Sequence, residues 1–292
     1  MAVVVPMSLR EAVDALAANP GALVLAGGTD AMVEINDGHR RVGHAGSPEV
    51  VVAVDRVAEL RSWTLDPAGS RLTIGAGVTY TELMEEPLAS FVPALAEASR
   101  TVGSPQIRNA GTLGGNLGTC SPAGDGLPVL SALDAEVHLA GATGTRTVSV
   151  HDFMVGVKQT VLAPGEIITA VTVPLLDGWQ GYSKVGVRNA MVIATASACL
   201  AVDQPTRSVR IALGSVAPTI VRAPEAESFA AGHVDWGAGH VDPATAGEFG
   251  RLAAAAARPI DDHRSSAAYR RHAIDVMARR LLERAFRGAD PT

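Results

Sequence analysis

Two glycine-rich segments, far apart in the chain, have the residue types and spacing to bind phosphate, and we expect both to be loops. The first is Ala26-Gly27-Gly28-Thr29-Asp30, and the second runs from Asn109 to Gly118 and continues to Asp125. Glycine has no side chain, so neighbouring backbone N–H groups can approach a phosphate without obstruction. Two such segments in one compact domain predict a long phosphate-bearing ligand, such as a dinucleotide, held from two sides.

The surroundings of both segments exclude two common nucleotide-binding motifs. Neither matches G-x-G-x-x-G between a strand and a helix, nor a phosphate loop that ends in Gly-Lys-Ser/Thr. A Rossmann dehydrogenase or a kinase is therefore disfavoured. The spacing from Thr112 to Asn116 would let consecutive N–H groups, a hydroxyl and an amide converge on one pyrophosphate, and Asp125 suits a ribose hydroxyl. The alternative remains that both segments are only tight turns.

No other set of residues predicts catalysis or metal binding. The eight histidines show no metal-ligand spacing such as H-E-x-x-H, and no serine lies in a G-x-S-x-G context. Cys120 and Cys199 are the only cysteines, and an iron–sulfur cluster usually needs four thiolates. We therefore expect no catalytic residue and no metal ligand in this chain, and we interpret Cys120 as a packing residue beside the ligand.

Composition limits the class of protein and its partners. The chain has 292 residues, of which 47% are hydrophobic and 18% charged, which is enough for two domains with large cores. The net charge of −6 and an aromatic content of 4% argue against nucleic acid as a partner. No apolar stretch approaches the ~20 residues of a membrane span, and two isolated cysteines fit a reducing compartment. We therefore predict a cytoplasmic protein.

The elements that must position the first segment form a small α/β unit. A strand at 3–5 precedes a helix that Ser8 opens with Glu11 in a capping-box pattern. A strand at 22–25 leads into the glycines, and a strand at 50–54 follows. Farther along, we expect strands at 72–77, 135–140, 146–149 and 165–174, and helices at 80–84, 91–100 and 127–133.

A second domain is predicted after residue 176. Three strands at 181–187, 195–202 and 209–216 indicate a meander, and apolar residues at helical spacing from Tyr269 to Ala285 indicate a C-terminal helix. We expect the arginines of this helix to form a solvated face, with a partner-docking surface as the alternative. They are Arg270, Arg271, Arg279, Arg280 and Arg284.

The order of these motifs resembles the FAD-binding medium subunit of the molybdenum hydroxylases. This group includes carbon monoxide dehydrogenase, bacterial xanthine dehydrogenase, and nicotine or nicotinate dehydrogenase. The resemblance covers nearly the whole chain. It rests on the segments 26–30, 106–117, 121–125, 181–185 and 262–271.

The resemblance implies an α+β fold with two domains. The first, residues 1–176, would be a vanillyl-alcohol-oxidase-type FAD-binding domain of two α/β subdomains, about 1–57 and 58–176. The second, residues 177–292, would be a C-terminal domain of the carbon monoxide dehydrogenase flavoprotein type. It would contain a three-stranded antiparallel sheet and helices.

The resemblance also implies which residues bind FAD. One side of the pyrophosphate would be wrapped by Val24, Leu25, Ala26, Gly27, Gly28, Thr29, Asp30 and Ala31. The other side would be held by Thr112, Gly114, Gly115 and Asn116. Asp125 would bind a ribose hydroxyl, Ile168 would line the site and Lys184 would contact the flavin end. Val102 stands where some members have an aromatic flavin neighbour, so ring stacking is not expected there.

The implied function is electron transfer within a larger enzyme. FAD would accept electrons from the [2Fe–2S] clusters of a small subunit and pass them to NAD+, a quinone or oxygen. A large subunit would hold the molybdopterin cofactor and the substrate, and the complex would be a dimer of heterotrimers. Two alternatives remain, a free-standing FAD-dependent oxidase of the same fold and a non-catalytic FAD-binding assembly protein.

Overall fold

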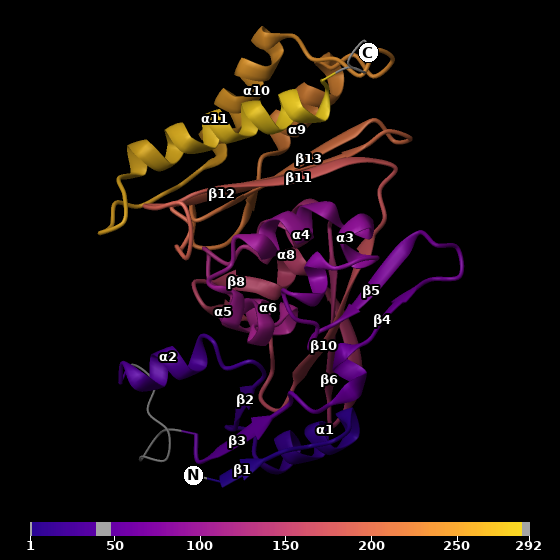
Figure 1. Ribbon diagram of the computed structural model, residues 1–292, viewed down its shortest axis with the longest axis vertical. Helices are drawn as coiled ribbons and strands as arrows, with labels where there is room; N and C mark the ends of the chain where they lie inside the picture. The colour runs from indigo at the N-terminus through magenta and orange to yellow at the C-terminus, as the bar shows by residue number, and fades with distance from the viewer. Residues whose placement is uncertain (1, 39–47, 288–292) are drawn as a thin grey trace.

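The protein consists of three parts that follow one another in chain order along its long axis. The computed structural model describes residues 2–38 and 48–287. The N-terminal part lies at one end and the helices of the C-terminal part lie at the other (Figure 1). Each part has its own buried core. None of the helices described is long and apolar enough to cross a membrane.

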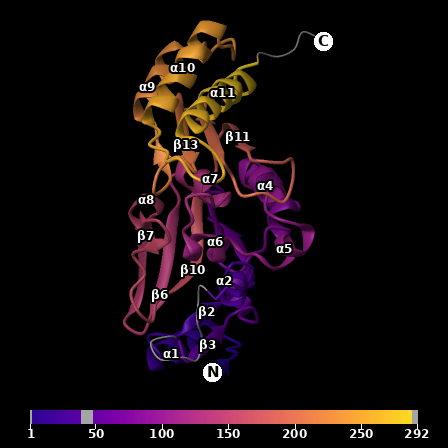
Figure 2. The ribbon, with the colours of Figure 1, turned by 90° about the vertical axis from the view of Figure 1, so that its left-hand side faces the viewer.

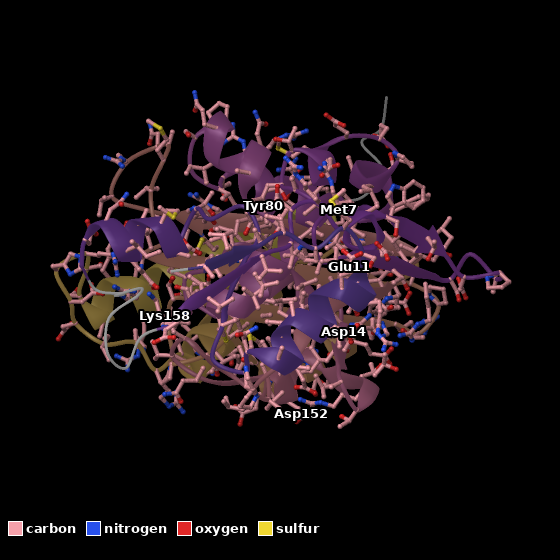
Figure 3. All side chains as sticks on the ribbon, turned by 90° about the horizontal axis from the view of Figure 1, so that it is seen from below. Met7, Glu11, Asp14, Tyr80, Asp152 and Lys158 are labelled. Carbon is pink, nitrogen blue, oxygen red and sulfur yellow. The ribbon has the colours of Figure 1, made fainter. Side chains whose placement is uncertain are left out.

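The N-terminal part is the expected α/β unit. A parallel sheet has the order β1 (Ala2–Val4), β3 (Val50–Ala53), β2 (Leu23–Leu25), and two helices accompany it, α1 (Leu9–Ala18) and α2 (Ala31–Asn36). The Ser8 side chain caps α1 by accepting from the Glu11 amide at 3.2 Å. The Glu11 carboxylate accepts from the Met7 amide at 2.7 Å rather than from Ser8, and both residues are labelled in Figure 3. The predicted helix start is confirmed, with this difference in its cap.

The middle part is built on a five-stranded antiparallel sheet. Its order is β4 (Trp63–Leu65), β5 (Arg71–Gly75), β10 (Ile167–Pro174), β6 (Glu136–Gly141), β7 (Gly144–Ser149). Around the sheet lie η1 (Ala58–Arg61), η2 (Glu82–Met84), α3 (Leu88–Phe91), α4 (Pro93–Arg100), α5 (Pro105–Ala110), α6 (Leu113–Thr119), α7 (Gly126–Ala132), α8 (Val150–Phe153) and the hairpin β8 (Met154–Gly156)–β9 (Gln159–Thr160). Every residue of α7 is buried, so this helix joins the sheet to the next part.

The second glycine-rich segment is mostly helical, whereas we had expected a loop. Thr112 caps α6, because its hydroxyl accepts from the Gly115 amide at 3.0 Å. A Cβ on Gly114 would lie 2.6 Å from the Cβ of Ala76, which follows β5. The glycine therefore allows α6 to lie directly on the turn after that strand.

The C-terminal part is a sheet covered on one face by helices (Figures 1 and 2). The three long strands β11 (Gly178–Val185), β12 (Ala196–Asp203) and β13 (Ser208–Gly214) form the predicted antiparallel meander. A two-residue strand, β14 (Val221–Arg222), adds a fourth member. The helices are α9 (Pro224–His233), α10 (Pro243–Ala256) and α11 (Ala267–Ala285), and the other side of the sheet contacts α4 and α7.

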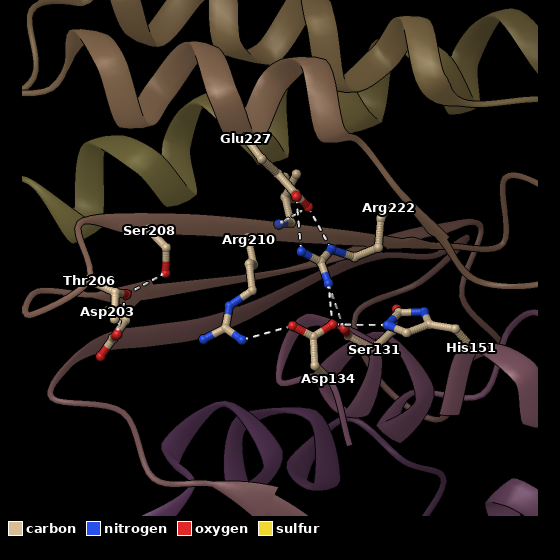
Figure 4. A network of polar contacts seen from close by, with 10 residues as sticks. Ser131, Asp134, His151, Asp203, Thr206, Ser208, Arg210, Arg222 and Glu227 are labelled. Atoms are coloured by element: carbon tan, nitrogen blue, oxygen red, sulfur yellow. Dashed lines mark hydrogen bonds and ion pairs between the residues drawn. The ribbon is translucent and has the colours of Figure 1, made fainter. Parts of the chain in front are cut away.

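One charged cluster joins the middle and C-terminal parts. Asp134, after α7, accepts hydrogen bonds from Arg210 at 2.9 Å, from Arg222 at 2.7 Å and from the ring of His151 at 3.0 Å (Figure 4). Arg222 also pairs with Glu227 of α9. Although partial burial opposes ionisation, these hydrogen bonds and the arginine charges hold the pKa of Asp134 well below its usual range. The cluster therefore favours the ionised carboxylate at neutral pH.

The expected solvated arginine face of α11 is wrong for Arg270. This side chain is only 4% exposed and donates to the carbonyls of Thr195 at 2.9 Å and Ser215 at 2.8 Å. It also pairs with Asp262 at 2.7 Å. The next residue, Arg271, is exposed as expected. Arg270 therefore fixes α11 to the end of the sheet, because buried carbonyls need donors.

Candidate functional site

A cavity of about 590 Å³ lies between the N-terminal and middle parts. This volume is within the roughly 300–1,000 Å³ of typical ligand pockets. Thirteen of the sixteen residues predicted to bind the cofactor line it. They are Val24, Leu25, Ala26, Gly27, Gly28, Thr29, Asp30, Ala31, Thr112, Gly114, Gly115, Asn116 and Ile168.

The two glycine-rich segments touch each other at this cavity. A Cβ on Gly27 would lie 1.6 Å from the carbonyl oxygen of Ala110, at the end of α5. Only glycine permits this approach, since real Cβ atoms essentially never come within 3.0 Å of another atom. Gly28 has a φ of +70°, a left-handed conformation that also favours glycine. Gly27 and Gly28 are thus required for different reasons, the first by a close contact and the second by its backbone conformation.

The first segment has free hydrogen-bond donors. Within the described part of the chain, the amides of Gly27, Gly28, Thr29 and Asp30 donate to no protein acceptor. The second segment differs from our expectation of consecutive free amides. Gly114 donates to the Ala76 carbonyl at 2.7 Å, and the amides of Gly115 and Asn116 both donate to Thr112. The first segment therefore offers the backbone donors, and α6 forms the opposite wall.

Lys158 and Arg61, the basic side chains that the described residues place on the cavity wall, are both paired with carboxylates. Lys158, in the turn between β8 and β9, contacts Glu34 of α2 at 2.6 Å, and Arg61 contacts Glu82 at 3.0 Å. The Asp30 carboxylate accepts from the Thr119 hydroxyl at 2.8 Å. Because Lys158 and Arg61 are already paired with carboxylates, the described part of the wall is suited to holding a phosphate with uncharged N–H and O–H donors.

Three predicted residues, Asp125, Lys184 and Val102, do not line this cavity. The Asp125 carboxylate accepts from Lys184 Nζ at 2.8 Å and from the Tyr182 hydroxyl at 2.7 Å. Burial raises the pKa of Asp125 above its ordinary value, while Lys184 and Tyr182 favour the charged form. Val102 packs at the edge of the middle core. Their roles toward a cofactor stay predictions.

Asn116 connects the cavity wall to the buried Asp125. Its side-chain oxygen accepts from the amide of Gly126, the residue after Asp125, at 3.2 Å. A Cβ on Gly124 would lie 2.7 Å from the Asn116 side-chain nitrogen. Asp125 is thus held close behind the wall that α6 forms, although its carboxylate is directed to Lys184 and Tyr182.

A second cavity of about 880 Å³ lies beside Lys184, between the middle and C-terminal parts. Its wall includes Arg100, Arg108, Arg188 and Arg284. Of these arginines only Arg284 pairs with a carboxylate in the described ranges, Glu97 at 3.1 Å. Arg108 and Arg188 donate to backbone carbonyls instead. This cavity therefore carries excess positive charge, unlike the first one.

Sequence reasoning missed several residues on the wall of the first cavity. Tyr80, Lys158, Glu34 and Asp55 line it without belonging to either glycine-rich segment. Tyr80 and Lys158 are labelled in Figure 3. No spacing in the sequence brings these residues together, because they come from four different elements or turns. Only the scarcity of aromatic residues could have drawn attention to Tyr80.

Comparison with known families agrees with this geometry. Residues 1–176 match the FAD binding domain in molybdopterin dehydrogenase, and residues 182–285 match the CO dehydrogenase flavoprotein C-terminal domain. The glyceraldehyde dehydrogenase medium chain of Sulfolobus acidocaldarius is 31% identical over 280 residues, which cover 94% of this chain and 95% of that protein.

Solved structures show the same architecture. Quinoline 2-oxidoreductase from Pseudomonas putida 86 has a chain that superposes with a TM-score of 0.87 and 27% identity, covering 98% of this chain and 97% of that one. Carbon monoxide dehydrogenase from Hydrogenophaga pseudoflava gives a TM-score of 0.86 and 29% identity, covering 99% and 98%. The sequence resemblance is confirmed, and the chain belongs to the FAD-binding medium subunits of the molybdenum hydroxylases.

Proposed function

We propose that this chain holds FAD in the cavity between its N-terminal and middle parts and so relays electrons from a partner's [2Fe–2S] clusters to an acceptor. The acceptor would be NAD+, a quinone or oxygen. FAD supplies the redox chemistry, and the protein supplies its position and surroundings. The observation that carries the proposal is the row of amides from Gly27 to Asp30, which find no acceptor among the described residues and line the same cavity as α6.

The chain's own groups fit the parts of such a ligand. The free amides of the first segment would donate to the pyrophosphate, and the small residues of α6 leave room on the opposite wall. Ile168, which is 7% exposed, offers an apolar contact on the cavity wall. Asp125 would bind a ribose hydroxyl and Lys184 would contact the flavin end. The ion pair between them joins the middle part to β11.

The partners follow from this role. We infer that the chain assembles with an iron–sulfur small subunit and a molybdenum large subunit, as a cytoplasmic dimer of heterotrimers. The positively charged second cavity beside Lys184 favours an anionic acceptor such as NAD+, because unpaired arginines attract phosphate. A charged acceptor would then approach between the middle and C-terminal parts.

The test compares the assembled complex with and without FAD under anaerobic conditions. When substrate is added to the complete complex, the visible absorption of clusters and flavin should both bleach, and each candidate acceptor is then tried for reoxidation. In the complex depleted of FAD, only the cluster absorption should bleach, and acceptor reduction should fall to background. Full acceptor turnover without FAD would refute the relay.

The same preparation separates the alternatives. A free-standing oxidase would oxidise its substrate with the isolated chain plus FAD and would need neither partner. A non-catalytic assembly protein would bind FAD without any change in flavin absorption when the clusters are reduced. Light scattering of the complex gives the stoichiometry independently.

A further inference from the structure

Tyr80 carries a hydroxyl group that the fold leaves without a partner at the wall of the first cavity. The residue is 5% exposed and lines this cavity. Its hydroxyl makes no hydrogen bond to any residue that the structure describes. The hydroxyl oxygen is not fully enclosed by protein, so it is open to the cavity that the residue lines. The hydroxyl is therefore a donor that is available to a ligand in the cavity.

The backbone around Tyr80 fixes this side chain beside the contact of the two glycine-rich segments. Its amide donates to the Gly111 carbonyl at 3.1 Å, and Thr79 pairs with Thr112 in an isolated bridge. A Cβ on Gly111 would lie 3.0 Å from the ring, so the absence of a side chain there makes room for Tyr80.

The charge around the hydroxyl decides what it can bind. Asp125 and Asp30 are both close enough to raise the pKa of Tyr80, in addition to the larger effect of burial, well above the ordinary value of 10. The phenol is therefore a protonated donor at every working pH. An acceptor oxygen must meet it, and the free amides of Gly27 to Asp30 on the wall of the same cavity favour a phosphate as its source.

We propose that the Tyr80 hydroxyl donates a hydrogen bond to a phosphate oxygen of the dinucleotide held in this cavity. The inference rests on the proposed function, because the dinucleotide is FAD. It adds a donor from the middle part to the amides of Gly27 to Asp30, so that the phosphates are held from both parts. Lys158 and Arg61 also line the cavity, but both are already paired with carboxylates, so they do not take the place of the Tyr80 hydroxyl as a phosphate donor.

The test measures the binding of FAD and of ADP to the deflavinated full-length chain with Tyr80→Phe. ADP contains the pyrophosphate but no flavin. One hydrogen bond to a charged acceptor corresponds to a loss of about ten- to a hundred-fold in affinity, and both ligands should lose the same factor. Tyr269→Phe is the matched control, because Tyr269 is 48% exposed on α11, and its affinities should equal those of the unmodified chain.

Stability is the second readout. Since the hydroxyl has no protein partner, Tyr80→Phe should leave the melting temperature of the deflavinated chain unchanged or slightly higher. Unchanged affinity for both ligands in a chain that binds FAD would overturn the inference and leave the proposed function intact. Weaker FAD binding with unchanged ADP binding would overturn the assignment to phosphate. Failure of the unmodified chain to bind FAD would instead overturn the proposed function.

Discussion

The contact between Gly27 and Ala110 gives a sharp test of how the cavity closes. Replacing Gly27 with alanine places a Cβ 1.6 Å from the Ala110 carbonyl oxygen, and this distance must grow to at least 3.0 Å. The two segments must therefore separate by 1.4 Å or more at the point where they meet. Because the contact joins two parts of the protein, the chain can relieve the overlap by opening the cavity.

A ligand held from both sides requires the cavity to close again. Overpacking typically costs about 1–3 kcal/mol. If this strain is imposed only on closure, FAD affinity should fall between about fivefold and a hundredfold, since each 1.4 kcal/mol is about tenfold. The melting temperature of the deflavinated chain should change by no more than a few degrees, because a chain of this size shifts about 2–4 °C per kcal/mol.

The assay is a titration of deflavinated protein with FAD, followed by the quenching of flavin fluorescence. Gly21→Ala is the matched control, because a Cβ at Gly21 meets no atom within 4 Å in the same N-terminal part. If Gly27→Ala binds FAD as tightly as Gly21→Ala does, the two segments do not close on the cofactor. A large drop in the melting temperature of the deflavinated chain would show that the contact belongs to the fold rather than to cavity closure.

Three further predictions concern stability. Arg270→Met should lower the free energy of unfolding in urea by about 3 kcal/mol, because it leaves two buried carbonyls without a donor, whereas the exposed Arg271→Met should change it by less than about 0.5 kcal/mol. Although its burial opposes ionisation, the Arg264 amide and Arg270 lower the pKa of Asp262 from 3.8 to about 2. The ionised Asp262 carboxylate should therefore contribute fully to the free energy of unfolding above about pH 4, and this contribution should be lost as the pH falls to about 2. Asp262→Asn should flatten the pH dependence of the free energy of unfolding over this range. Asp134→Asn should lower the free energy of unfolding by about 1 kcal/mol, because the neutral amide loses the charged contacts with Arg210 and Arg222. Asparagine tolerates the φ of +49° as well as aspartate does, so the change adds no backbone strain. An unchanged urea midpoint of unfolding would mean that the cluster contributes no net stability.

Much of the fold follows from local patterns. The cap at Ser8, the apolar strand before the first glycines and the three strands of the C-terminal meander are all predicted elements that the structure contains. The helix α6 was missed because Gly114, Gly115 and Gly118 disfavour a helix by intrinsic propensity. Packing against the turn after β5 overrides that propensity, and such packing leaves no signal at a fixed spacing in the sequence.

The electrostatic surroundings of the site were the least predictable feature. Asp125 and Lys184 are 59 residues apart, and only the folded chain shows that they are paired with each other rather than directed into the first cavity. Arg270 likewise follows the pattern of a solvated helix face until the carbonyls at the sheet end come within reach. Sequence spacing gives the position of a charge along an element, but its partner depends on tertiary contacts.

The glycines themselves show why a motif can identify a site without explaining it. Gly27 permits contact between two parts, Gly28 adopts a left-handed conformation, and Gly114 permits a helix to lie on a strand turn. Among the described residues, the amides of Gly27 and Gly28 find no acceptor, whereas those of Gly114 and Gly115 are bonded, so the same residue type serves binding in one place and packing in another. Substitution of Gly114 should therefore disturb the fold of the middle part, and cofactor binding is tested more cleanly at Gly27 and Tyr80. A glycine-rich pattern locates the cavity, whereas the unpaired donors around it determine what the cavity can hold.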